Sequence, residues 1–307
     1  MTAALHAALE PRLAGLGLTP RQLLERDAPG GLAQPGLTSA NRHCHLLRCA
    51  DGWLALNLAR EDDQDLIPAL CEGGADLAAY AAGQNAAALL GRAIELQLPA
   101  ALPGESAALP LAPLEMARVP ELVVDLSALW AGPLCAALLA RAGARVVRIE
   151  SLGRPDPTAQ GSPRLDALLS DGKERLPLDL RTDPGRAALH DLLARADVLV
   201  TSARPAALAR LGLDPAHFPH LTWAAITAHG FTGPGALRVG FGDDCAVAGG
   251  LLHWQNGQPR FMGDALADPL TGLEAARAVL AGQRGLIDLA MARIAASYAK
   301  ILKFKFG

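Results

Sequence analysis

The sequence predicts an α/β fold: an open, mostly parallel, Rossmann-like sheet with helices on both faces, preceded by a small α+β domain. From residue 121 onward, short runs rich in valine and isoleucine alternate with segments whose apolar residues recur at helical spacing. Such alternation is typical of parallel α/β sheets. Before that point, residues 45–59 contain one pair of strand-like runs, and most of the other residues have helical spacing.

Stretches rich in glycine, proline or alanine suggest where the parts of the chain are joined. Two of them, residues 27–36 and 99–120, predict linkers. We therefore expect four parts: an N-terminal helical segment with its linker (1–36), a small α+β domain (37–105), a Rossmann-like domain (119–299) and an atypical tail (300–307). The tail stands apart because it holds Lys300, Lys303 and Lys305, whereas Lys173 is the only lysine before it.

The elements before residue 100 follow from local patterns. Residues 1–36 predict one or two helices. In "HLLRCADGWLALNLA" two apolar runs flank Asp51 and Gly52, a dipeptide that favours a tight hairpin turn. From there to about Pro99 the pattern is mostly helical, most clearly in "AAALLGRAIELQLP".

The elements after residue 120 form repeated strand and helix units. "ELVVDLS" predicts a strand, "PLCAALLARAG" a helix closed by Gly143, and "ARVVRIE" a second strand. This is a βαβ unit, for which a right-handed crossover is expected. The alternation continues through "DPGRAALHDLLARA", "DVLVTS", "PAALARLG" and "LTWAAITAHG".

The composition argues against several classes of protein. A net charge of −3 and an aromatic content of 4% do not suit a nucleic-acid surface. No run of about 18 apolar residues and no leader pattern occurs, so we expect no membrane association and a cytoplasmic location. The five cysteines are odd in number and scattered, as expected of reduced thiols.

Several familiar site motifs are missing. The turn after the first strand, "LSALWAGP", lacks the G-x-G-x-x-G of dinucleotide-binding sites, and the chain has neither a P-loop nor a G-x-S-x-G elbow. "HCHLLRC" offers His43, Cys44, His45 and Cys49, but their spacing fits no closed zinc pattern. Neighbouring ligands on a strand would also point to opposite faces. We expect strand packing here and no metal.

The segment "GDALADPLTG" contains two aspartates, Asp264 and Asp268. Asp268 has an ordinary explanation as a helix N-cap, because it precedes Pro269 and an apolar pattern of helical spacing. A reactive carboxylate is the alternative, and this stretch alone does not decide between them.

Five motifs, in order, resemble those of the family III CoA-transferases, which include formyl-CoA and carnitine CoA-transferases and belong to one superfamily with the α-methylacyl-CoA racemases. The motifs are "VVDLSALWAGPLCAALLARAGARVVRIES", "DGKERLPLDLRTDPGR", "ADVLVTSARPAALARLGL", "ITAHGFTGPG" and "GDALADPLTGLEAA". The resemblance implies a Rossmann-like domain that binds coenzyme A and carries the catalytic residue. It places Asp268, and not Asp264, at the position of the catalytic nucleophile.

The resemblance also implies the substrates and the contacts with coenzyme A. The substrates are an acyl-CoA and a free carboxylic acid, and an aspartyl acyl anhydride and an aspartyl-CoA thioester are the intermediates, with no metal required. Trp130 and Ala131 correspond to positions beside the pantetheine and thioester. The remaining contact candidates are Arg148, Leu178, Arg181, Ser202, Ala203 and Arg210. Family members form interlinked dimers, so we expect a homodimer.

The chain departs from the family pattern in several ways. The segment resembling the start of the family's small domain precedes the α/β half, so the order looks permuted. Asp171 replaces an asparagine, Ser202 and Ala203 replace an N-F pair, and no run of glycines is present. Two alternatives therefore stay open. One is an inactive CoA-binding relative, and the other is a racemase.

A racemase of this superfamily needs a histidine in a G-H-D segment. The corresponding "GFGDD" supplies Asp243 and Asp244 but no histidine, and neither His229 nor His253 matches that motif.

Overall fold

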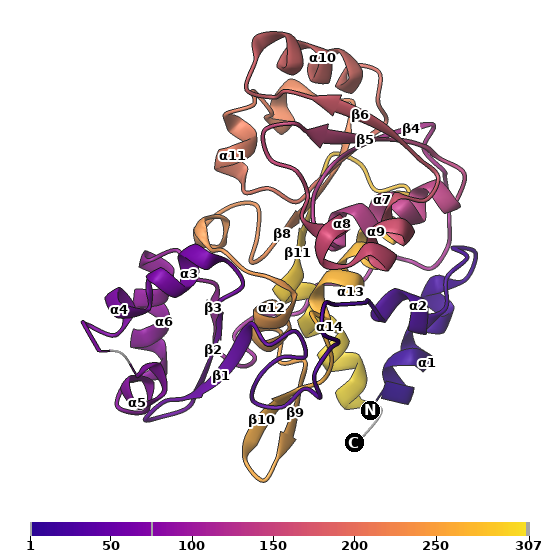
Figure 1. The fold of residues 1–307 in the computed structure, drawn as a ribbon. Helices are drawn as coiled ribbons and strands as arrows, with labels where there is room; N and C mark the ends of the chain where they lie inside the picture. The colour runs from indigo at the N-terminus through magenta and orange to yellow at the C-terminus, as the bar shows by residue number, and fades with distance from the viewer. Residues whose placement is uncertain (1, 75, 305–307) are drawn as a thin grey trace.

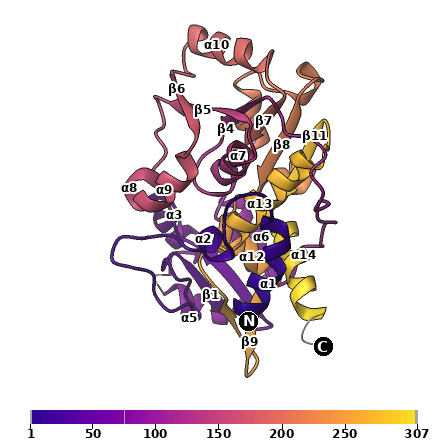
Figure 2. The same ribbon diagram turned by 90° about the vertical axis from the view of Figure 1, so that its right-hand side faces the viewer.

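The central feature is a parallel sheet of six strands, seen in a computed structural model that describes residues 2–74 and 76–304. Its order is β11-β8-β7-β4-β5-β6 (Figure 1 and Figure 2). The strands are β4 (Leu122–Leu126), β5 (Arg145–Ser151), β6 (Lys173–Leu178), β7 (Val198–Thr201), β8 (Thr222–Thr227) and β11 (Leu286–Ala290). The mostly parallel sheet predicted from the sequence is confirmed.

Alternate residues of the central strands face two hydrophobic cores. On one face, Val123 and Val198 pack with α7 (Ala131–Arg141) and α13 (Ala267–Leu280). On the other face, Val124 and Leu199 pack with α10 (Asp183–Leu193) and α11 (Pro205–Ala209). Strands buried on both faces explain why these segments are almost continuously apolar. The prediction of helices on both faces is also confirmed.

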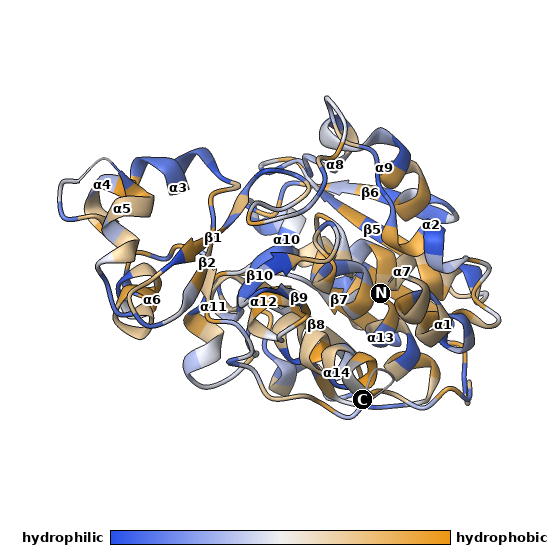
Figure 3. Cartoon of the chain, turned by 90° about the horizontal axis from the view of Figure 1, so that it is seen from below, coloured by the Kyte–Doolittle hydropathy of each residue, from blue (hydrophilic) through white to orange (hydrophobic). Residues whose placement is uncertain are grey.

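The larger core is built around α13. Every residue of α13 except Asp268 is buried. Gly272 allows α7 to approach closely, because a Cβ at this position would overlap the carbonyl oxygen of Ala131. Seen from below and coloured by hydropathy, α7 is largely apolar (Figure 3).

The N-terminal helices pack against this same core. They are α1 (Thr2–Leu13) and α2 (Pro20–Leu24), and Leu9 and Leu23 belong to the larger core. Arg12 of α1 pairs with buried Glu274 of α13, and Tyr298 of α14 (Met291–Phe304) donates to the same carboxylate over 2.7 Å. The first and last helices of the chain therefore lie side by side (Figure 2).

A second, antiparallel sheet lies at one side of the molecule (Figure 1). Its strands are β1 (Cys44–Arg48), β2 (Trp53–Asn57) and β3 (Ala100–Ala101), and its helices are α3 (Glu61–Asp65), α4 (Ile67–Leu70), α5 (Leu77–Ala82) and α6 (Ala86–Glu95). Arg48 pairs with Trp53 across the predicted turn at Asp51 and Gly52, so the hairpin is confirmed. Leu46 and Ala55 pack against Val247 of α12 (Gly242–Ala248), which links the small sheet to the rest.

The remaining elements are short. They are the hairpin of β9 (Leu252–Gln255) and β10 (Gln258–Phe261), the helix pair α8 (Thr158–Gly161) and α9 (Pro163–Ser170), and two 3₁₀ turns (Pro215–His217 and Pro234–Leu237). Of the predicted atypical tail, residues 300–304 continue α14, and residues 305–307 lie outside the described part of the chain. Among the described residues, no helix is both long and apolar enough to cross a membrane.

The contact between α7 and α13 should be sensitive to one added methyl group. We expect Gly272→Ala to lower the free energy of unfolding by ~1–3 kcal/mol, because the helices must move apart. Gly91→Ala in α6 is the control, since a Cβ there would meet no atom within 4 Å. The control should leave stability unchanged or raise it by up to ~1 kcal/mol. Urea denaturation measures both variants, and equal effects would contradict the close contact.

Candidate active site

The site is centred on Asp268, in the first turn of α13. The helix begins at Ala267, two residues earlier than the N-cap explanation requires, so Asp268 is not the cap and Pro269 is the third helical residue. The chain enters the helix through Ala265, whose φ is 45°, and the Asp268 amide donates to the Ala265 carbonyl over 2.9 Å. Among the described residues, no hydrogen bond reaches the Asp268 carboxylate, which is partly exposed.

The start of α12 packs directly onto the start of α13. Gly242 makes this contact possible, because a Cβ there would overlap both the Asp268 carboxylate and the Ala265 carbonyl oxygen. The next two residues, Asp243 and Asp244, are buried. Two first helical turns therefore bring three carboxyl groups together.

The carboxylates of α12 are held by hydrogen bonds. Asp243 accepts from Asn41 over 2.6 Å and from the Ala265 amide over 2.8 Å. Asp244 accepts from Asn57 over 3.0 Å and from the Phe241 amide over 2.9 Å. These bonds fix the orientation of both groups, in contrast to the free carboxylate of Asp268.

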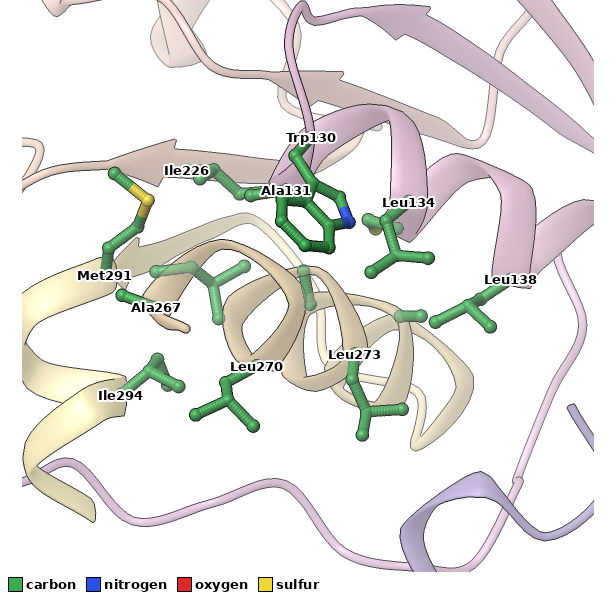
Figure 4. Close-up of a cluster of buried hydrophobic side chains, with 14 of the residues drawn as sticks. Trp130, Ala131, Leu134, Leu138, Ile226, Ala267, Leu270, Leu273, Met291 and Ile294 are labelled. Atoms are coloured by element: carbon green, nitrogen blue, oxygen red, sulfur yellow. The ribbon is translucent and has the colours of Figure 1, made fainter. Parts of the chain in front are cut away.

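Asp264 brings a cation into the cluster. Asp264 forms an ion pair with Arg26, which donates to it from Nε and, over 3.1 Å, from Nη2. Asp264 also accepts a hydrogen bond from the Asn41 amide group over 2.9 Å. The guanidinium carbon of Arg26 lies 5.5 Å from the centre of the Trp130 ring, a cation–π contact. Trp130 directly precedes α7, and its ring lies over α13 (Figure 4).

Burial changes the protonation of these groups. It raises the pKa of Asp268 to about 7; the charge of Arg26 opposes the rise, and Asp243 and Asp264 add to it. Burial likewise raises the pKa of Asp244 to about 7 and that of Asp243 to about 6. Removing a carboxylate from water disfavours its ionised form, and like charges nearby add to the effect. The cluster therefore retains protons near neutral pH.

Several predicted contacts with coenzyme A lie at the carboxyl edge of the large sheet. Trp130 and Ala131 follow β4, Leu178 ends β6, and Ser202 and Ala203 follow β7. The Ser202 hydroxyl accepts from the Ala128 amide over 2.9 Å and so joins two of these strand ends. In open α/β sheets, ligands bind outside the carboxyl ends of the strands.

The three predicted arginine contacts have different surroundings. Arg148 is buried, and its guanidinium is already paired with Asp156 over 2.7 Å. Asp156 also accepts a hydrogen bond from the Leu129 amide. Arg181 is exposed and pairs with Asp179 over 2.8 Å. Arg210, at the end of α11, is exposed, with no ion pair among the described residues.

The sequence analysis missed Arg26 and Asn41. Both lie before the α/β half, in segments where no motif marks them. Their partners Asp243 and Asp264 are more than 200 residues away along the chain. Arg26 reaches the site through the packing of the N-terminal segment, and Asn41 reaches it through the packing of the small domain.

One group of side chains could offer ligands to a metal ion. Ligand atoms of His229, Asp244 and Cys245 lie within 4.8 Å of one another. Burial lowers the pKa of His229 to about 3 and raises that of the Cys245 thiol, so the imidazole is neutral and the thiol keeps its proton. A protonated thiol is a poor ligand.

The segment "HCHLLRC" lies in and next to β1. Its residues Cys44 and Cys49 are buried, and the His45 ring lies near the Thr38 hydroxyl.

Comparisons with known proteins point to one family. The sequence model of a family described as CoA-transferase family III matches residues 122–286, more than half of the chain. An acyl-CoA transferase of Fusarium pseudograminearum is 31% identical over 173 residues, which cover 49% of this chain and 38% of that protein. The human succinyl-CoA:glutarate CoA-transferase is 30% identical over 174 residues, covering 52% and 40% respectively. This chain thus spans less than half the length of these relatives.

Solved structures resemble the chain as well. A crystal structure of a hypothetical protein from Mycobacterium tuberculosis matches with a TM-score of 0.54 and 27% identity, covering 66% of this chain and 60% of that one. A CaiB/BaiF family protein from Brucella suis matches with a TM-score of 0.53 and 27% identity, covering 64% and 58%.

The raised pKa values predict how stability depends on pH. Between pH 6.5 and 8 the carboxyl groups of the unfolded chain are ionised, while Asp244 and Asp268 still bind protons in the folded state. The folded state then holds more protons, so the free energy of unfolding should fall as pH rises. His229, with its pKa lowered to about 3, opposes this fall at the lower end of the window, where the unfolded imidazole still binds protons, and has lost its proton in both states by pH 8.

Urea denaturation at a series of pH values measures this slope. Asp244→Asn should flatten it, because the amide keeps an acceptor oxygen but cannot titrate. Asp62→Asn, an exposed aspartate of α3, is the control and should leave the slope unchanged. A free energy of unfolding that rises with pH across the window would contradict the buried cluster.

Proposed function

Because the chain belongs to CoA-transferase family III, we propose that it moves coenzyme A between carboxylic acids with Asp268 as the nucleophile. One observation carries the assignment. Asp268 is the single partly exposed residue of a buried helix, and its carboxylate has no hydrogen-bond partner among the described residues. A largely buried carboxylate that has no hydrogen-bond partner and sits on a rigid helix is suited to react rather than to support the fold.

The proposed reaction begins when an ionised Asp268 oxygen attacks the carbonyl carbon of an acyl-CoA. The C–S bond breaks, the thiolate of coenzyme A leaves with the electron pair, and a mixed anhydride remains on the enzyme. The thiolate then attacks the aspartyl carbonyl carbon and releases the first acid as its carboxylate. Asp268 now carries coenzyme A as a thioester.

The second half of the reaction repeats these steps in reverse with another acid. Its carboxylate attacks the aspartyl thioester and expels the thiolate, which then attacks the acyl carbon of the new anhydride. A new acyl-CoA leaves and the Asp268 carboxylate is regenerated. Because the energy of the thioester is kept in each intermediate, the exchange needs neither ATP nor a metal.

The electrostatics of the site suit this chemistry. With a pKa of about 7, Asp268 is ionised in a large fraction of molecules at neutral pH, and it is more nucleophilic than a carboxylate of ordinary pKa. The amides of Asp268 and Leu270 already donate to the carbonyls of Ala265 and Leu266, and Pro269 has no N–H. The first turn of α13 can therefore stabilise a negative oxygen mainly through the positive end of the helix dipole.

We propose that coenzyme A lies along the carboxyl edge of the sheet. Its pantetheine would pass Trp130 and Ala131, and its nucleotide would lie near Leu178, Ser202 and Ala203. The exposed guanidinium groups of Arg181 and Arg210 can pair with phosphates. Arg148 contributes indirectly, through Asp156, to the turn before α7.

The relatives suggest a class of acid and a setting. Several are named for exchange between short dicarboxylic acids such as succinate and glutarate, and we propose these as the first substrates to test. We further propose a homodimer in the cytoplasm. All five cysteines are unpaired and buried, which fits a reducing compartment.

The racemase alternative has less support. Asp243 of the "GFGDD" segment is engaged by Asn41 and Ala265, and His229 lies beside Asp244 and Cys245. The relatives described above are named as transferases.

Replacing Asp268 should separate catalysis from binding. We expect Asp268→Asn to lower CoA exchange between succinyl-CoA and glutarate by at least about 10³-fold, because the amide cannot form the anhydride. Coenzyme A affinity, measured by calorimetry, should stay within about 2-fold, since the phosphates bind elsewhere. Asp62→Asn serves as the control and should retain full exchange.

Two outcomes would contradict the proposal. Exchange that survives in Asp268→Asn would exclude this nucleophile. A wild-type chain that binds coenzyme A but exchanges nothing across a panel of acyl-CoA donors and acids would instead favour a CoA-binding relative without catalysis.

A further inference from the structure

Arg26 lies in the active-site cluster although it comes from the N-terminal segment, outside the residues that match the family model. Its side chain is 23% exposed, whereas that of its partner Asp264 is 5% exposed. Part of the arginine side chain is therefore accessible to solvent at the site, although its partner in the ion pair is buried.

The hydrogen bonds of Arg26 leave part of its guanidinium free. Nε and Nη2 are used side-on by the two carboxylate oxygens of Asp264. Among the described residues, Nη1 has no acceptor. A guanidinium has five N–H donors, so this arrangement leaves donors available for a second planar anion.

The arginine is also held firmly in place. Asp264 is itself fixed by Asn41, which bridges it to Asp243, and the guanidinium lies against the ring of Trp130. Such support fixes the direction of the free N–H groups before any ligand arrives. Asp264 thus orients the arginine, whereas its neighbour Asp268 stays free.

The charges of the site create a need for this cation. Four aspartates, at positions 243, 244, 264 and 268, lie close enough for their charges to act on one another, and a negatively charged acid must approach one of them, Asp268. Arg26 is the cation whose charge acts on both Asp268 and Asp243. Without it, the approach of a carboxylate would be opposed by every ionised aspartate of this cluster.

We propose that Arg26 is a substrate-contacting residue, whose Nη1 group binds the carboxylate of the acid that exchanges coenzyme A. The inference rests on the proposed function. It implies that an acid binds best when Asp268 is uncharged, as it is in the aspartyl thioester. The N-terminal segment then completes the site that the α/β half builds.

Binding of glutarate, succinate and acetate, measured by calorimetry at pH 8, tests the inference without turnover. Asp268→Asn imitates the uncharged state and should bind at least one of these acids about 5-fold more tightly than the wild type. Adding Arg26→Ala to that variant should weaken binding by at least about 10-fold. Arg21→Ala, an exposed arginine of α2, is the matched control and should have no effect.

A further variant guards against a folding defect. Arg26→Ala leaves Asp264 buried without its partner, so the change is also made together with Asp264→Asn, and thermal unfolding is followed for both. The folded double variant should lose acid binding as well. Arg26→Lys, which cannot pair side-on and donate elsewhere, should restore only part of it.

The outcomes separate this inference from the proposed function. Acid binding that is unchanged by loss of Arg26, or absent for all three acids in Asp268→Asn, would overturn the role of Arg26. The proposed function is tested separately. It stands, even when the role of Arg26 is overturned, if the wild type exchanges coenzyme A and Asp268→Asn does not. Exchange that survives in Asp268→Asn would overturn the nucleophile and leave the binding result to decide on Arg26.

Discussion

The close packing of α7 against α13 is the contact on which the rest of the site depends. Gly272 lies one helical turn after Asp268 on α13, and it touches the carbonyl of Ala131 at the start of α7. The same face of α13 thus presents Asp268 toward Trp130 and the sheet edge. On the far side, Glu274 and Arg277 anchor α13 to the N-terminal helix through buried polar bonds. A carboxylate on so constrained a helix keeps its position when a substrate binds.

The electrostatics of the site follow from a second contact of α13, which Gly242 makes possible. Bringing the first turns of α12 and α13 together places carboxyl groups in a space poor in water, where ionisation is costly. Hydrogen bonds from Asn41 and Asn57 satisfy Asp243 and Asp244 without adding charge. Arg26 is directed at Asp264, so Asp268 is influenced by its charge but not bound by it. The result is a carboxyl group poised between its two protonation states near neutral pH.

Much of the fold could be predicted because its signals are local. The apolar runs of β4 and β5, the glycine that ends the intervening helix, and the Asp51–Gly52 turn each act within a few residues. The start of α13 was less clear, because Asp and Pro also suit a helix cap. The pair of Arg26 and Asp264 joins positions 238 residues apart and has no local signal. Motif resemblance singled out Asp268, but the groups that surround it depend on tertiary packing.

The central claim is that Asp268 is covalently modified during exchange, and mass spectrometry tests it most directly. The chain is incubated with succinyl-CoA, treated with hydroxylamine and digested with trypsin, which releases residues 261–277 as one peptide containing both Asp264 and Asp268. The account predicts a hydroxamate located by fragmentation at Asp268. Modification at Asp264, or an unmodified peptide from an enzyme that exchanges coenzyme A, would contradict it.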